Sequence, residues 1–405
     1  MIMYIKRNKY IILLAVLYVL IFQNILQEYC RPFQYLDELF VIAFGIEAII
    51  ALRKMMKGFE IPKWIILVCV LLGCIIVIGL LGNVIYQYQV WKSVIPDLAV
   101  FCKYFSAIFV GYMLEIDECF FSNNNLLRKN LNRIVFIWLV MAVLYVFMNG
   151  TYVGMLPLKL FYGHPTFLAA SCSVWLSLSL TASRTKKDQV FEIIVWLMLI
   201  LTLRSKAYAI AFIFAFIRFF TVERGLKIDL LKIAGLAGVS IFIAWNKIIK
   251  YFVVFVKSAR NVLYKYSLIL AHDHFPVGTG FGSFASYFSG TNYSKVYPAY
   301  NLDHVEGLIW PKCEYISDSF WPMILGQFGI IGLILYISVL GIIFIQIQKL
   351  YLNSSRIYAG ALFAFIYLLV VSIAESAFVN SYSVMFGFIT GICLSCKADK
   401  GGQLI

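Results

Sequence analysis

The sequence is short of charge. Only 13% of its 405 residues are Asp, Glu, Lys or Arg, whereas 62% are hydrophobic. Soluble domains carry about 25% charged residues, so this composition excludes an ordinary soluble protein. The mean hydropathy of +0.87 indicates an integral membrane protein instead.

Other absences exclude whole classes of chemistry. The sequence has no Walker-type phosphate loop, internal repeat, low-complexity tract or soluble domain, which argues against an ATP-driven mechanism. Its nine cysteines fall mostly inside apolar runs without zinc spacing, so we interpret them as small buried residues. The histidine pair at His272 and His274 lacks further ligands at a suitable spacing. We therefore predict no metal and no cofactor.

Long apolar runs recur along the whole chain. A helix needs about 20 apolar residues to cross the hydrocarbon core of a bilayer. Twelve segments approach that length, so we predict an all-α polytopic membrane protein with about twelve transmembrane helices. The segments are residues 10–27, 36–52, 63–82, 94–114, 132–149, 165–182, 189–203, 206–221, 229–246, 319–346, 357–375 and 380–396.

The basic residues of the connections predict the orientation of these spans. With the N-terminus in the cytoplasm, most Lys and Arg residues of the short connections fall on the inner side, as the positive-inside rule requires. The C-terminus is then cytoplasmic as well. The formal net charge of +14 is explained as a topology signal that faces anionic inner-leaflet lipids, and no nucleic-acid partner is predicted.

One long polar stretch, residues 247–318, interrupts the apolar pattern between the ninth and tenth spans. It divides the chain into nine spans over 1–246, the loop itself, and three spans with a cytoplasmic tail over 319–405. The predicted orientation places this loop outside, together with all four histidines. Apolar residues with basic residues between them over 247–270 predict an amphipathic helix on the outer surface, followed by a Gly-rich turn at 278–282.

Several charges lie where an apolar chain rarely places them. Arg204 and Lys206 stand on the outer side between two apolar segments. One interpretation is a basic hairpin whose side chains reach the headgroups. The other is an anion site for a diphosphate, because a guanidinium holds phosphate oxygens in a bidentate fork. Lys103 and Asp97 of the fourth span, and Glu375, indicate either structural ion pairs or functional groups.

Three blocks of the sequence resemble one known family. They are residues 201–206, then Arg260 with residues 276–284, and then residues 318–332. Their order, and the long outer loop between the ninth and tenth spans, are similar to those of the O-antigen polymerases and ligases. These are the Wzy-like and WaaL-like membrane glycosyltransferases.

That resemblance implies a metal-independent glycosyltransferase at the outer face of the bacterial cytoplasmic membrane. Such proteins take a glycan from an undecaprenyl diphosphate carrier and transfer it, with inversion, to a sugar hydroxyl. Arg204 and Arg260 match the family arginines that hold the diphosphate, and Lys206 adds a third cation. The implied partners are carrier-linked donor and acceptor oligosaccharides, membrane lipid and a chain-length regulator.

The sequence departs from the family pattern at the catalytic histidine. Asp318 and Ser319 occupy the place where many members have a His-Asn pair, eleven residues before the first glycine of a Gly-Ile-Ile-Gly turn. A carboxylate can accept the proton of an attacking hydroxyl, so Asp318 and His304 are the candidate bases. His164 is a candidate for the rim of the site, or an interfacial histidine beside a helix-starting proline.

Three functions stay open at this point. A polymerase joins two carrier-linked repeat units of O-antigen or capsule polysaccharide, whereas a ligase transfers the glycan to the lipid A core. The sequence of residues 318–323 is more similar to that of the polymerases, which we favour. A flippase or transporter is the more distant alternative, and the missing repeat symmetry and the single long outer loop weigh against it.

Overall fold

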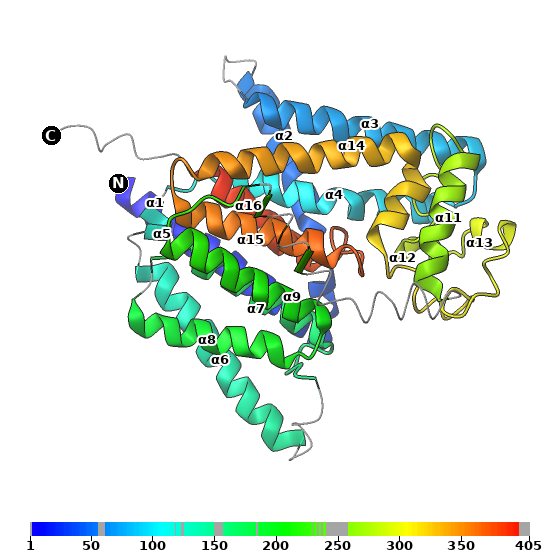
Figure 1. The fold of residues 1–405 in the computed structure, drawn as a ribbon. Helices are drawn as coiled ribbons and strands as arrows, with labels where there is room; N and C mark the ends of the chain where they lie inside the picture. The colour runs from blue at the N-terminus through cyan, green and yellow to red at the C-terminus, as the bar shows by residue number, and fades with distance from the viewer. Residues whose placement is uncertain are drawn as a thin grey trace.

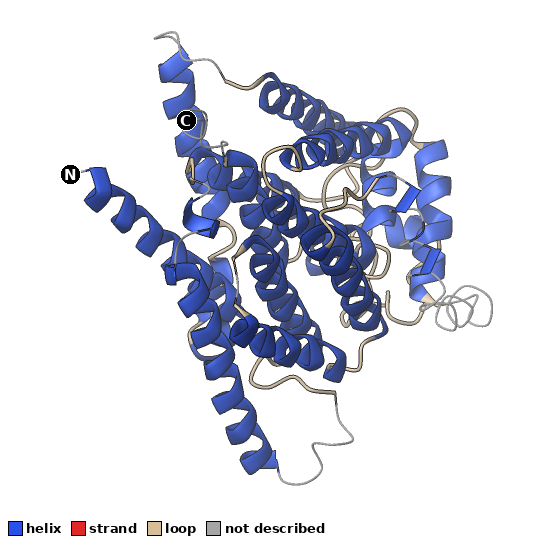
Figure 2. Ribbon diagram, turned by 60° about the vertical axis from the view of Figure 1, so that its left-hand side comes forward, coloured by secondary structure: helices blue, strands red, loops and turns tan. Residues whose placement is uncertain are grey.

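The computed structural model describes residues 2–55, 61–117, 119–122, 125–149, 157–183, 185–229 and 258–396, with isolated positions between 231 and 239 (Figure 1). Within these residues the chain is helical and has no strand, and Figure 2 shows the same bundle from a second direction. Six helices of the described residues are long and apolar enough to cross a membrane. These six are Lys9–Tyr29, Lys63–Tyr86, Trp91–Met113, Leu126–Met148, Ser205–Glu223 and Phe320–Leu350.

The helices follow the predicted spans in order. The predicted ninth span, 229–246, and residues 247–257 of the loop lie largely outside the described residues, while each other predicted span coincides with a described helix. The all-helical fold, with apolar helices long enough to span a membrane, is thus confirmed. The count of twelve spans and their orientation stay predictions. The long elements are α1 (Ile2–Tyr29), α2 (Leu39–Met55), α3 (Lys63–Tyr86), α4 (Trp91–Met113), α6 (Asn125–Asn149), α7 (Pro165–Thr181), α8 (Lys186–Leu201), α9 (Ser205–Ile217), α14 (Phe320–Leu350), α15 (Ser355–Val371) and α16 (Tyr382–Ser395).

Shorter elements join these helices. The 3-10 helix η1 (Arg31–Tyr35) connects α1 to α2, α5 (Cys119–Ser122) precedes α6, and the π-helical turn η3 (Arg218–Glu223) extends α9. The loop carries α11 (Ala259–Asp273), α12 (Tyr287–Thr291) and α13 (Val296–Ala299). The amphipathic helix predicted over 247–270 is therefore present in its described part as α11.

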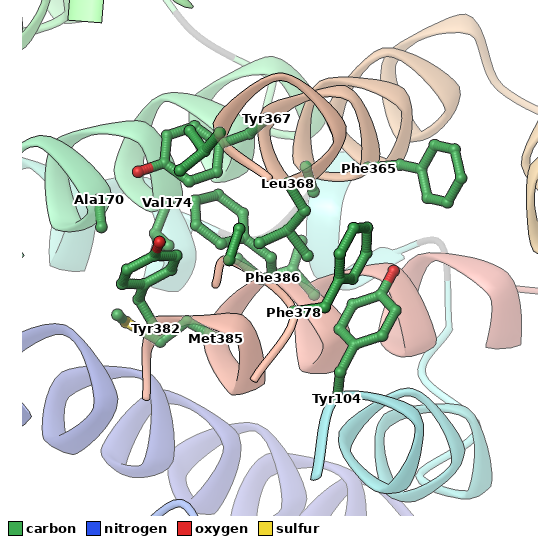
Figure 3. Close-up of a cluster of buried hydrophobic side chains, with 14 of the residues drawn as sticks. Tyr104, Ala170, Val174, Phe365, Tyr367, Leu368, Phe378, Tyr382, Met385 and Phe386 are labelled. Carbon is green, nitrogen blue, oxygen red and sulfur yellow. The ribbon is translucent and has the colours of Figure 1, made fainter. Parts of the chain in front are cut away.

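The core lies where α4, α7, α15 and α16 meet (Figure 3). Tyr104, Phe378 and Phe386 are fully or almost fully buried there. Small residues let α4 and α16 approach closely: a Cβ added at Gly391 would stand 2.1 Å from Ile108 O. Close backbone approach at small residues is a common way for helices to associate in a bilayer.

The start of α1 and the end of α16 lie at one end of this bundle. Lys9 Nζ donates to Glu115 O at 3.2 Å, and Ile116 N–H donates to Ser395 Oγ at 3.1 Å. Both helices therefore contact the connection that follows α4. Helices α11, α12 and α13 gather at the opposite end (Figure 1). An even number of crossings between α1 and α16 agrees with this arrangement.

A break in α14 ties the loop to the bundle. Gly329 has a non-helical backbone, with φ 65° and ψ −171°. The Gly-rich turn fills the break: Thr279 N–H donates to Gly326 O at 3.0 Å, and Gly280 N–H donates to Gln327 O at 2.9 Å. Opened backbone inside an apolar bundle needs partners of this kind. Gly278 is required for the approach, because a Cβ there would stand 2.5 Å from Gly329 N.

Two polar side chains of the bundle hold the same turn. Asn83 of α3 pairs with Phe281 twice: its Nδ2 donates to Phe281 O at 2.9 Å, and its Oδ1 accepts from Phe281 N–H at 2.8 Å. Asp97 of α4 accepts from Gly282 N–H at 2.7 Å. Asp97 therefore anchors the Gly-rich turn through a backbone hydrogen bond.

Candidate functional site

A polar cavity of about 660 Å³ lies at the end of the bundle that carries the loop. Its walls come from the η1–α2 connection, α4, the start of α7, α12, and the segments that precede α14 and α16. Two residues predicted from the sequence, Asp318 and His164, line it. Glu375 lines it too, at the connection from α15 to α16. Ionisable groups from distant parts of the sequence thus share one cavity.

The three predicted cations stand behind these cavity residues. Arg260 Nη2 lies 3.3 Å from Asp318 Oδ2 and 3.2 Å from Ala374 O. Lys206 forms an ion pair with Glu375, whose other carboxylate oxygen accepts from a buried tyrosine hydroxyl. Since the two carboxylates line the cavity, their cationic partners are within a side-chain length of it. Packing thus brings together a loop arginine and a hairpin lysine that the sequence keeps far apart.

Arg204 contacts His164, which lines the same cavity. Arg204 Nη2 lies 2.5 Å from His164 Nε2, and His164 Nδ1 faces Thr166 N–H at 3.3 Å, where it caps α7. Burial, together with the Arg204 charge, lowers the pKa of His164, so the ring is neutral at pH 7. A neutral imidazole has one lone pair for these two donors. The two contacts therefore cannot both be hydrogen bonds to a neutral ring.

Arg204 also carries unused hydrogen-bonding capacity of its own. Its Nε–H is buried and meets no acceptor among the described residues. No carboxylate lies within ion-pair distance of Arg204 in the part of the chain that the structure describes. A buried donor without a partner costs free energy, and a bound anion would recover that cost.

Asp318 is the candidate base that the structure places in the cavity. Its side chain lies just before α14 and is part-exposed. Burial raises the pKa of Asp318 above its ordinary value, and the Arg260 guanidinium opposes that rise. A carboxylate with a raised pKa is a better proton acceptor, because its conjugate acid holds the proton more firmly.

The structure places His304 away from the cavity that Asp318 lines. The His304 side chain is 82% exposed, and its Nε2 lies 3.7 Å from Asp303 Oδ1. Among the described residues it is not one of those that line the cavity. Of the two candidate bases, Asp318 is therefore the one that lines the cavity.

The wall formed by the η1–α2 connection was not predicted from the sequence. Asp37 Oδ2 lies 2.5 Å from Lys103 Nζ, and both side chains are buried. Asp37 is thus the partner of the intramembrane lysine, 66 residues away in the chain. The only signal in the sequence was the acidic pair Asp37-Glu38 at the edge of an apolar run.

An apolar groove of about 660 Å³ begins beside the ion pair of Arg260 and Asp318. It runs between α11 and α14, and its lining includes Tyr264 and Leu268 on one side and Trp321 on the other. Tyr264 is one helical turn after Arg260, and Trp321 is three residues after Asp318. The groove therefore leads away from the charged group along the face of the bundle.

The arrangement can hold an anionic group near Arg204 and present a carboxylate beside it. Among the described residues, no three His, Cys, Asp or Glu side chains are grouped to hold a metal ion. A scan against protein-family models finds no match to this chain, and a search of the curated proteins finds none. The function is therefore argued from the chemistry of the cavity.

Proposed function

We propose that this protein transfers a glycan from a polyprenyl diphosphate carrier to a sugar hydroxyl at the outer face of a bacterial cytoplasmic membrane. We favour a polymerase that joins carrier-linked repeat units of O-antigen or capsule polysaccharide. One observation carries the proposal. Three cations from two distant segments each contact a residue that lines one polar cavity in an otherwise apolar bundle, and Asp318 is among these residues.

The charge of the group suits a diphosphate. The cations Arg204, Lys206 and Arg260 and the carboxylates Asp318 and Glu375 leave one net positive charge. The unused Nε–H of Arg204 supplies a donor for a phosphate oxygen. As the diphosphate leaves with the electron pair of its bond to the sugar, negative charge develops on it, and fixed cations lower the barrier to that step.

The transfer needs few other groups. The oxygen of the acceptor hydroxyl attacks the anomeric carbon of the donor from the side opposite the diphosphate, so the configuration inverts. The new C–O bond forms as the bond to the diphosphate breaks, and Asp318 takes the proton of the hydroxyl. Because the diphosphate is already a good leaving group, the step requires no general acid.

The groove between α11 and α14 suits the carrier chain. It starts beside Arg260 and Asp318, and its lining is almost entirely apolar. A carrier whose diphosphate rests on the cations can lay its hydrocarbon chain in this groove and continue into the bilayer. The substrate then enters the site laterally from the bilayer, because its long polyprenyl chain stays in the membrane.

The direct test is chain lengthening by the purified protein. The full chain is placed in lipid nanodiscs with the undecaprenyl diphosphate oligosaccharide of the producing strain, and the products are separated by size. A polymerase gives a ladder that grows one repeat at a time. Transfer only to added lipid A core indicates a ligase, and the absence of any transfer overturns the proposal.

Asp318→Asn is expected to slow lengthening by about 10²- to 10⁴-fold, the usual contribution of a positioned base. The amide keeps the shape of the side chain and cannot take the proton. Asp318→Glu is the matched variant and should retain part of the rate. The rate of lengthening at saturating substrate is measured for each. Full activity of Asp318→Asn would overturn the role of Asp318 as the base.

A further inference from the structure

The wall of the cavity at η1 and α12 has a different chemistry from the cationic side. Two tyrosine side chains line it and stay open to solvent: Tyr35 of η1 is 60% exposed, and Tyr287 of α12 is 66% exposed. An aromatic ring combines an apolar face with a polar edge, so exposed rings at a polar cavity suit a ligand that is itself amphipathic. Neither ring is needed by the reaction described above.

A carboxylate with a free oxygen stands on the same wall. Asp37 is fully engaged, because Lys103 Nζ lies 2.5 Å from one of its oxygens and Gln23 Nε2 donates to the other at 3.1 Å. Its neighbour Glu38 also lines the cavity. Glu38 Oε2 is buried and has no hydrogen-bond partner among the described residues. An unpaired buried acceptor of this kind is costly unless a ligand satisfies it.

We propose that this wall is a carbohydrate subsite, which binds the acceptor sugar with its C–H faces on Tyr35 and Tyr287 and one hydroxyl donating to Glu38. The inference rests on the proposed function, and it assigns the second substrate to a place of its own. The donor diphosphate occupies the cationic side, and the acceptor approaches from η1 and α12.

The composition of the wall selects against other ligands. A second anion would meet the carboxylates of Asp37 and Glu38, with only Lys103 to offset them. A purely apolar ligand would leave the serine, glutamine and carboxylate groups of the lining without partners, since polar groups make up much of the exposed wall. A sugar supplies both hydroxyl donors and apolar C–H faces, which matches the two kinds of group present.

The first experiment measures binding of a carrier-free probe. The probe is the oligosaccharide that mild acid releases from the surface polysaccharide of the producing strain, titrated into the full-length protein in nanodiscs. Tyr35→Ala and Tyr287→Ala should each raise the Kd about tenfold, while the corresponding Tyr→Phe variants keep the ring and bind nearly as well as the wild type. Tyr29→Ala is the matched control, because Tyr29 is 79% exposed and does not line the cavity.

The second measurement tests Glu38 independently of folding defects. Glu38→Gln should weaken binding of the same probe about tenfold. The apparent Tm of this variant is measured at the same pH, and a Tm no lower than that of the wild type shows that weaker binding is not a folding defect. Probe affinity equal to that of the wild type overturns the role of Glu38.

The outcomes separate this inference from the proposed function. A wild-type protein that binds the free oligosaccharide but never lengthens a carrier-linked one keeps the subsite and loses the polymerase. Lengthening by the wild type, with unchanged probe affinity in both Tyr→Ala variants, keeps the polymerase and overturns the subsite. Absence of probe binding by the wild type overturns the subsite as well.

Discussion

Replacing Arg204 with alanine is expected to abolish detectable lengthening of carrier-linked glycans while the protein still inserts and folds. Among the three cations of the site, it is the one without a carboxylate partner in the described part of the chain, so its charge acts fully on the substrate. Loss of one preorganised donor to developing negative charge costs about 10²- to 10³-fold in rate, or about 3 to 4 kcal/mol.

The matched variants sharpen this test. Arg204→Lys keeps the charge and loses the planar fork, so an intermediate rate is expected. Arg31→Ala removes an exposed arginine of η1 outside the cationic group and should leave the rate unchanged. Labelled products are counted by length over time for each variant. Lengthening by Arg204→Ala at the wild-type rate would show that the diphosphate is held elsewhere.

Lys103→Met is expected to destabilise the protein by about 3 to 5 kcal/mol, because it leaves the buried carboxylate of Asp37 without its cation. The double variant Lys103→Met with Asp37→Leu should recover most of that loss, since apolar residues of similar volume replace a buried ion pair at little cost. Thermal unfolding in detergent micelles measures both.

Lys92→Met serves as the control for this second prediction. Lys92 lies exposed at the start of α4, so the change should alter stability little. If the double variant unfolds at the same temperature as Lys103→Met alone, the ion pair is not the source of the effect. Lys103→Met is therefore compared with the double variant and with Lys92→Met.

The helices of this fold could be predicted well from the sequence, because each span is a long apolar run and run length has a direct physical meaning in a bilayer. The cations could be predicted as unusual for the same reason: Arg204 and Lys206 interrupt such runs on the predicted outer side. Arg204 and Lys206 could be singled out without knowing which residues contact them in the fold.

The partners of these charges could not be predicted in the same way. Lys206 pairs with Glu375, 169 residues later, and Lys103 pairs with Asp37, 66 residues earlier. Such pairs depend on which helices pack side by side, and apolar patterning says little about that order. The break at Gly329 was likewise hidden, because a glycine within a helical run does not by itself show that backbone bonds are exchanged with a distant turn.

The break in α14 at Gly329 also restrains the segments on either side of the Gly-rich turn. The Gly-rich turn is bonded into α14 and to Asn83, so its backbone is tied to two helices of the bundle. Arg260 precedes this anchor in the chain and Asp318 follows it, and lifting the loop would strip backbone partners from an apolar interior. Under the proposed function, the cationic group would therefore stay in place while the lipid carriers move past it.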